Sequence, residues 1–230
     1  MSEAPFILFG QQHLIALALS VLIIIYFPLY AKNHLSKDRQ ETTAKFLALF
    51  LIAHELAKPF YRTYFFGDEL VKVIPLHACN LSAFLIAIYL FTRKKVFFEV
   101  AYYWGLAGGT MALLTPDLLY AFPDVEWFPL FTGHGVMIMA IFFSMFCHNI
   151  FPTKHSFRRV VLITLSLLPV IYIINTLLGP PANYWYLNTK PEADSLMSFM
   201  PSPPFHIPIA MGIALEFSVY YTSLLGKNYR

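Results

Sequence analysis

The chain alternates between long apolar stretches and short polar connections. Seven apolar stretches cover about residues 8–31, 43–61, 75–92, 96–115, 128–150, 157–178 and 204–226. Each approaches the roughly 20 residues that a helix needs to cross a bilayer. The pattern therefore predicts an all-α membrane protein, with a single transmembrane domain over residues 1–230 folded as a seven-transmembrane-helix bundle.

The charges in the connections predict how this bundle is oriented. Basic residues gather in the first, third and fifth connections and in the C-terminal tail: Lys32, Lys37, Arg39 and Lys45; Arg93, Lys94 and Lys95; Lys154, Arg158 and Arg159; Lys227 and Arg230. The fourth connection, 116–127, is acidic and contains no Lys or Arg. Because Lys and Arg accumulate on the cytoplasmic side, we expect the N-terminus outside and the C-terminus in the cytoplasm.

Composition supports a membrane protein and narrows the possible partners. Hydrophobic residues make up 58% of the chain and charged residues 13%, which leaves too little polar surface for a water-soluble domain. The net charge is +3, but no run of basic residues resembles a nucleic-acid site, so we expect membrane lipids and no nucleic acid as partners. The first apolar stretch is too long for the core of a signal peptide, so we expect it to remain as a helix.

Polar side chains are concentrated in the predicted outer half of the bundle. The densest group is Pro75–Asn80, which contains His77, Cys79 and Asn80 at the start of an apolar stretch. Proline suits the first position of a helix, so Pro75 and Pro129 predict two helix starts. Counted from these prolines, Cys79 and His134 would lie at matched depths of roughly 6–8 Å. Ionisable groups within a membrane are costly and indicate a functional site.

Cys79 and His134 suggest a nucleophile and its base. A thiol near a helix N-terminus has its thiolate form favoured, and a neighbouring neutral histidine can accept its proton. His77 is expected to point elsewhere, because side chains two residues apart on a helix diverge by about 200°. Zinc binding by His77, Cys79 and His134 is the competing interpretation, but no closely spaced second Cys and no His pair at i,i+4 supports it. No cofactor is expected. The two cysteines, Cys79 and Cys147, are expected at opposite faces of the bilayer as free thiols.

Simpler explanations exist for several other polar or aromatic residues. His13 and His206 are expected near the outer interface, where a hydrated histidine needs no function. Glu55 can form a local ion pair with Lys58 at i+3, and 184–186 resembles an interfacial aromatic belt. The long connection 179–204 is a candidate lid over the interface. Glycines 105, 108 and 109 are expected to let a neighbouring helix approach closely.

Five short motifs resemble a known family. Pro-Leu-His-Ala-Cys-Asn at 75–80, Trp-Gly-Leu-Ala-Gly-Gly at 104–109, Leu-Leu-Thr-Pro-Asp at 113–117, Gly-His-Gly at 133–135 and Asn-Tyr-Trp-Tyr-Leu at 183–187 are similar to motifs of the YwaF-type bacterial integral membrane proteins. That group is similar to eukaryotic transmembrane protein 164, an acyltransferase that moves fatty acyl chains between phospholipids. The resemblance implies a Cys nucleophile and a His partner, which fall on Cys79 and His134. It also implies a bacterial cytoplasmic membrane protein. The segment 200–206 departs from the family pattern.

The leading hypothesis is an acyltransferase or lipid hydrolase with its site on the extracytoplasmic side. Cys79 would attack a lipid ester and His134 would move the proton, with Asn80, Asn183 or a backbone N–H near Pro75 as oxyanion donor. The expected supporting or substrate-binding residues also include His77, Glu55, Asp117 and Tyr184. Glu55 or Asp117 would orient a histidine or hold a cationic head group. The alternative is a non-enzymatic transporter or lipid-binding protein with a polar outer pocket. The oligomeric state stays open.

Overall fold

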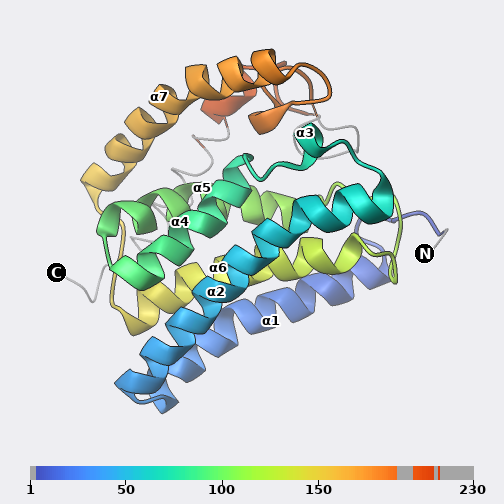
Figure 1. Ribbon diagram of the computed structural model, residues 1–230. Helices are drawn as coiled ribbons and strands as arrows, with labels where there is room; N and C mark the ends of the chain where they lie inside the picture. Colours follow the sequence, from blue (N-terminus) through green and yellow to red (C-terminus); the bar gives the residue numbers. More distant parts are fainter. Residues whose placement is uncertain (1–3, 191–198, 210–211, 213–230) are drawn as a thin grey trace.

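The computed structural model describes residues 4–190, 199–209 and 212, and these residues form helices and no β-sheet (Figure 1). The long helices are α1 (Gln11–His34), α2 (Lys37–Tyr61), α4 (Ala78–Thr92), α5 (Lys95–Leu114), α6 (Trp127–Cys147) and α7 (Lys154–Leu178). Shorter elements are η1 (Arg62–Phe66), a π-helical turn, α3 (Leu70–Val73) and η2 (Tyr184–Tyr186), a 3₁₀ turn. Six of the predicted helices are therefore present. The seventh, 204–226, falls largely outside the described residues, of which 206–209 and 212 are helical.

The surface of the long helices is that of a membrane protein. Among the described helices, α1, α6 and α7 are long and apolar enough to cross a bilayer, and α4 is a shorter apolar helix. On α1, large side chains such as Ile15, Leu22 and Tyr26 are more than half exposed. Water would not accept so much apolar surface, whereas lipid does. The chain is a helical membrane protein, and the count of seven spans remains a prediction.

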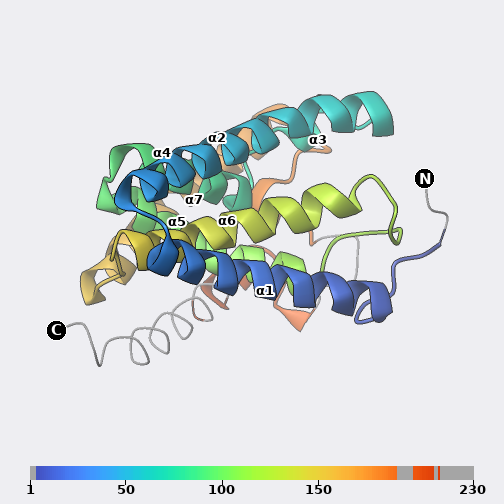
Figure 2. The same ribbon diagram turned by 90° about the horizontal axis from the view of Figure 1, so that it is seen from below.

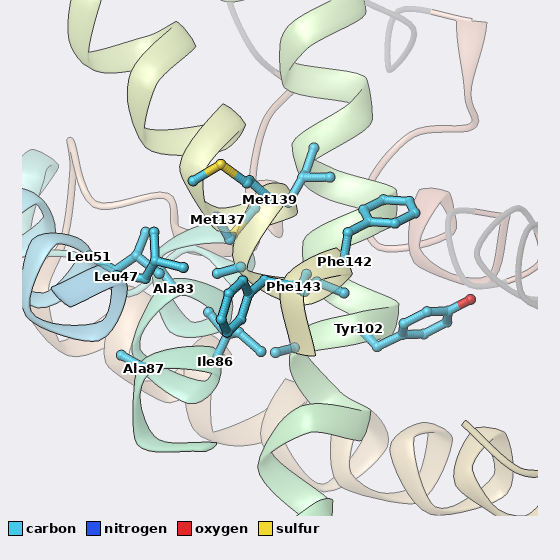
Figure 3. Close-up of a cluster of buried hydrophobic side chains, with 14 of the residues drawn as sticks. Leu47, Leu51, Ala83, Ile86, Ala87, Tyr102, Met137, Met139, Phe142 and Phe143 are labelled. Atoms are coloured by element: carbon cyan, nitrogen blue, oxygen red, sulfur yellow. The ribbon is translucent and has the colours of Figure 1, made fainter. Parts of the chain in front are cut away.

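The core lies where α2, α4, α5 and α6 meet. It contains Leu51, Ile86, Tyr102, Met137 and Phe143, all nearly inaccessible (Figure 3). α4 packs against both α2 and α5, and α5 packs against α6. α1 lies along α6 in both views, while α7 contacts α5 and η2 (Figures 1 and 2).

Small residues explain the close approach of α5 and α6. A Cβ atom at Gly105 would lie 2.8 Å from Ile141 Cδ1, and one at Gly109 would lie 2.8 Å from Met137 Cε. Both distances are shorter than real contacts, so a larger residue would force the ends of the Ile141 and Met137 side chains to move. The packing role predicted for these two glycines is confirmed.

The basic connections meet at one end of the bundle. Lys37 Nζ donates a hydrogen bond to the Cys147 carbonyl at 3.4 Å, and Arg93 forms an ion pair with Glu41. These contacts join the connections that follow α1, α4 and α6. At the opposite end, Arg62 pairs with Glu126, between η1 and the acidic connection. This separation agrees with the alternating charges, while the side of the membrane that each end faces remains a prediction.

The two prolines do not begin their helices, so that prediction was wrong. α4 begins at Ala78, because the Asn80 side chain accepts a hydrogen bond from the His77 N–H at 3.1 Å and so caps the helix there. Pro129 is the third residue of α6. Cys79 is therefore the second residue of α4 and His134 the eighth of α6, which is about 1.5 Å and 10 Å from the helix starts. Their depths within the helices are not matched.

Candidate functional site

A polar pocket of about 330 Å³ lies at the end of the bundle opposite the basic connections. Five of the predicted site residues line it: His77, Cys79, Asn80, Asp117 and His134. Lys58, Arg62, Gly108, Glu126 and Tyr186 also contribute to its wall. The pocket thus gathers side chains from α2, η1, α4, α5, α6 and η2. Glu55, Asn183 and Tyr184 lie outside its lining.

Cys79 occupies the first turn of α4, where it faces α5. Its side chain is half-buried, and the cysteine is free, as is Cys147. A Cβ atom at Gly108 would lie 2.6 Å from Cys79 Sγ, so a hydrogen at this position of α5 leaves room for the thiol. The first turn of a helix also carries unpaired N–H groups and a partial positive charge, both of which favour a thiolate.

Gly108→Ala should lower the free energy of unfolding by about 1–3 kcal/mol, because the new methyl group overlaps Cys79 Sγ. Gly135→Ala is the matched control, since its Cβ would meet nothing within 4 Å. Titration of dodecyl sulfate into mixed micelles measures both. Adding Cys79→Ala to Gly108→Ala should recover most of the loss. Equal stability of the Gly108→Ala and Gly135→Ala proteins would contradict the contact.

The hydrogen bonding of His134 defines its tautomer. Its Nδ1 lies 2.9 Å from the Leu130 carbonyl oxygen, which can only accept a hydrogen bond. Nδ1 therefore carries a hydrogen, and in the neutral ring Nε2 keeps its lone pair. Among the hydrogen bonds of the described residues, none joins His134 to Cys79, although both side chains line the pocket. The ring is thus set up as a proton acceptor that faces a shared cavity.

Glu55 is buried beneath the pocket and joins two of its walls. Its side chain accepts hydrogen bonds from Asn80 Nδ2 at 2.6 Å and from Lys58 Nζ at 3.4 Å. The predicted ion pair with Lys58 is confirmed. Because Asn80 also caps α4, Glu55 holds the turn that carries Cys79 through a single intervening side chain.

His54 extends this network to α6. Its Nδ1 lies 3.3 Å from Glu55 Oε1, and its Nε2 lies 3.2 Å from the Pro129 carbonyl oxygen. The two ring nitrogens therefore face oxygen atoms on two different helices. A Cβ atom at Gly133 would lie 2.4 Å from His54 Cε1, which explains a glycine at that position. His54 and Glu55 therefore connect α2 to the first turns of α4 and α6.

Glu55→Gln should lower the free energy of unfolding by about 1–3 kcal/mol, because the buried contacts of Lys58 and His54 lose their charged acceptor. Glu41→Gln is the matched control. Glu41 pairs with Arg93 but its side chain is 53% exposed, so its loss should cost less than about 1 kcal/mol. The same micelle titration compares the two. If Glu41→Gln proves the more damaging change, the network does not hold the site.

The segment 183–187 packs over the start of α4. Tyr184 is fully buried, its hydroxyl donates to the Val71 carbonyl, and its backbone is held by Asn175. Trp185 Nε1 donates to the Leu76 carbonyl at 2.9 Å. The interpretation of 184–186 as an interfacial aromatic belt does not fit Tyr184 and Trp185, because these two rings are buried inside the protein. The His77 ring packs against Tyr184 and Tyr186, with centroids 5.6 and 5.0 Å away.

Asn183 does not reach the pocket. Its Nδ2 donates to the Thr189 carbonyl and hydroxyl oxygens, and its Oδ1 accepts from the backbone N–H groups of Asn188 and Thr189. The side chain therefore closes a local turn. The suggestion that it acts as an oxyanion donor was wrong.

The two histidines expected to be hydrated are buried. His13 is 1% exposed; its Nε2 donates to the Leu113 carbonyl at 2.8 Å and its Nδ1 accepts from the Phe9 N–H at 3.0 Å. His206 is 3% exposed, with Nε2 3.2 Å from the Trp185 carbonyl oxygen. Both histidines form hydrogen bonds with backbone groups elsewhere in the chain instead of facing water. Sequence position alone did not reveal these long-range partners.

Two groups that line the pocket have shifted pKa values. Burial raises the pKa of Glu126, and the Arg62 guanidinium opposes that shift. Burial also raises the pKa of Tyr186 far above its usual range, so this phenol stays neutral and can donate a hydrogen bond. Within the part of the chain that the structure describes, no group of three or more His, Cys, Asp or Glu side chains could hold a metal ion.

Comparison with known proteins identifies the family of this chain and a bacterial relative. Residues 8–221 match the model of the TMEM164 family. An uncharacterized protein from Treponema pallidum (strain Nichols) is 26% identical over 188 residues, which cover 81% of this chain and 76% of the relative. No solved structure matches the chain significantly.

Proposed function

Because the chain belongs to the TMEM164 family, we propose that it is a membrane-embedded acyltransferase or lipid hydrolase that acts through Cys79 and His134. The observation that carries the proposal is that both side chains line one pocket, one as a thiol in a helix's first turn and the other with Nε2 available. The pocket end lies away from the basic connections, which supports a site on the extracytoplasmic side of a bacterial cytoplasmic membrane.

In the first step, Cys79 becomes acylated. His134 Nε2 takes the thiol proton, and Sγ attacks the carbonyl carbon of a lipid ester to form a tetrahedral oxyanion. The oxyanion then collapses and breaks the bond to the alcohol oxygen. His134 returns its proton to that oxygen, so the alcohol product leaves and the acyl group remains on Cys79 as a thioester.

Three groups are suited to stabilise the oxyanion. Asn80 Nδ2 gives one hydrogen to Glu55 and has a second one available, and the backbone N–H of Cys79 lies in the first turn of α4, where no carbonyl four residues earlier serves it. Lys58 lines the pocket and contributes a positive charge. One well-placed donor is worth about 3–4 kcal/mol of barrier.

In the second step, an acceptor removes the acyl group. An alcohol or a water molecule gives its proton to His134 Nε2 and attacks the thioester carbonyl. The C–S bond breaks, and the thiolate of Cys79 recovers the proton from the imidazolium. An alcohol acceptor makes the protein a transferase, and water makes it a hydrolase.

A protein with a single thiol tests the proposal. The chain has two cysteines, so Cys147→Ala leaves Cys79 as its sole thiol. In vesicles of a phosphatidylglycerol and phosphatidylethanolamine mixture, this protein should release a lysophospholipid together with either a fatty acid or a newly acylated lipid. Prior alkylation with N-ethylmaleimide should stop product formation.

Product formation that survives complete alkylation of Cys79 would contradict the proposed chemistry. If no ester is cleaved while a lipid still binds in the pocket, the non-enzymatic lipid-binding alternative replaces it. Equal amounts of lysophospholipid and free fatty acid indicate hydrolysis. Lysophospholipid formed in excess of free fatty acid indicates transfer to an acceptor.

A further inference from the structure

An apolar groove lies beside the polar pocket, and Tyr61 belongs to both. The groove, an open space of about 950 Å³, is lined chiefly by Ala57, Phe60, Tyr61, Tyr64, Phe65 and Leu70. On the other side of Tyr61, the pocket wall contains Lys58 and Arg62, both charged. The two concavities therefore place a groove without charged side chains next to a pocket that contains several.

The sequence creates this groove through the way that α2 ends. Pro59 lies in the last turn of α2 and has no N–H to donate to a carbonyl of the preceding turn. The helix then widens into the π-helical turn η1, where the Arg62 N–H is shared between the Lys58 and Pro59 carbonyl oxygens. Gly67, with φ of +70°, reverses the chain and allows Leu70 to return to the groove.

The groove wall is unusually apolar and exposed. Phe60 is 78% exposed, Tyr64 82% and Phe65 60%. No charged side chain lines the groove. Apart from the tyrosine hydroxyls, its one polar side-chain group is the Thr63 hydroxyl. Such a surface is unfavourable in water, and aromatic side chains of this kind are typical of membrane interfaces. A hydrocarbon chain fits this chemistry, whereas a polar solute does not.

We propose that the apolar groove holds the acyl chain of the lipid substrate and directs its ester past Tyr61 into the polar pocket. An ester joins an apolar chain to a polar head, and the groove and pocket present these two environments in that order. The identity of the ester rests on the proposed function, but binding of the chain requires no turnover. The new element is the place of the acyl chain, which lies along the end of α2 and η1.

Cross-linking in an inactive protein tests the binding site separately from catalysis. Cys79→Ser protein is placed in phosphatidylcholine vesicles with a phosphatidylcholine probe that carries a diazirine in one long acyl chain. Cross-links should concentrate on residues 57–70. Ala57→Trp, which fills the groove, should remove them. Ala53→Trp is the matched control, because Ala53 is also exposed on α2, one turn earlier, but lies outside the groove.

Cross-links spread evenly over the lipid-facing surfaces of α1 and α7, and unchanged by Ala57→Trp, would overturn the proposal. With Cys79 present, Ala57→Trp should also shift ester cleavage from long-chain to short-chain lipids, and Ala53→Trp should not. Cross-links confined to the groove, in a protein that cleaves no ester even with Cys79 present, would support the assignment of the groove and contradict the proposed function. Ester cleavage with the same chain-length preference in both tryptophan variants would contradict the assignment of the groove and leave the proposed function standing.

Discussion

Replacing Cys79 by alanine should abolish cleavage of lipid acyl esters. The substitution removes the atom that forms the thioester, and no other thiol lies in the pocket, because the second cysteine, Cys147, is buried near the opposite end of the bundle. The rate of ester cleavage should therefore fall to the uncatalysed background. Release of lysophospholipid from vesicles that contain the purified protein measures it.

Cys147→Ala is the matched control for this experiment and should retain most of the activity. The Cys79→Ala substitution removes a single sulfur atom that lies against Gly108, so it should disturb the packing of α4 and α5 little. Its resistance to unfolding by dodecyl sulfate should stay within about 1 kcal/mol of the parent protein. A Cys79→Ala protein that cleaves lipid esters as fast as the parent would end the proposed mechanism.

Replacing His134 by asparagine should slow ester cleavage by about 10²- to 10⁴-fold, the usual contribution of a general acid–base group. Asparagine places an N–H near the position of Nδ1, so the hydrogen bond to the Leu130 carbonyl oxygen can persist. What disappears is Nε2, the atom that accepts the proton. The variant therefore removes the base while preserving the local structure.

A second readout separates a chemical role for His134 from a structural one. In a Cys147→Ala background, the rate at which iodoacetamide alkylates Cys79 at neutral pH reports how readily the thiol loses its proton. His134→Asn should lower that rate together with ester cleavage. If both rates match those of the parent, His134 is not the base.

Much of the fold was predictable from the sequence. The ends of six helices lie within three residues of the predicted ones, except that α2 begins six residues earlier, because long apolar runs and charged connections mark the helices directly. The exact helix starts were not predictable from proline. α4 begins at Ala78, three residues after Pro75, where the Asn80 side chain accepts the His77 N–H. Asp124 Oδ1 accepts the Glu126 N–H just before α6, so local hydrogen bonds determine where each helix begins.

The candidate site was only partly predictable. The polar residues near both prolines converge on one pocket, as their expected place in the outer half indicated. The links between helices were not visible in the sequence. Glu55 reaches Asn80 on another helix, and His54 reaches the Pro129 carbonyl oxygen 75 residues later. The sequence predicted Gly108 only as one of several packing glycines, and its distance to Cys79 Sγ reveals its place in the site.

The most direct test of Cys79 as the nucleophile is peptide mass spectrometry of protein quenched with acid during turnover of a phospholipid. The peptide that contains Cys79 should carry the mass of one acyl chain, and neutral hydroxylamine should release it, as expected for a thioester. The adduct should be absent from the Cys79→Ala protein. Accumulating products with no acyl group on Cys79 at any time would contradict the mechanism.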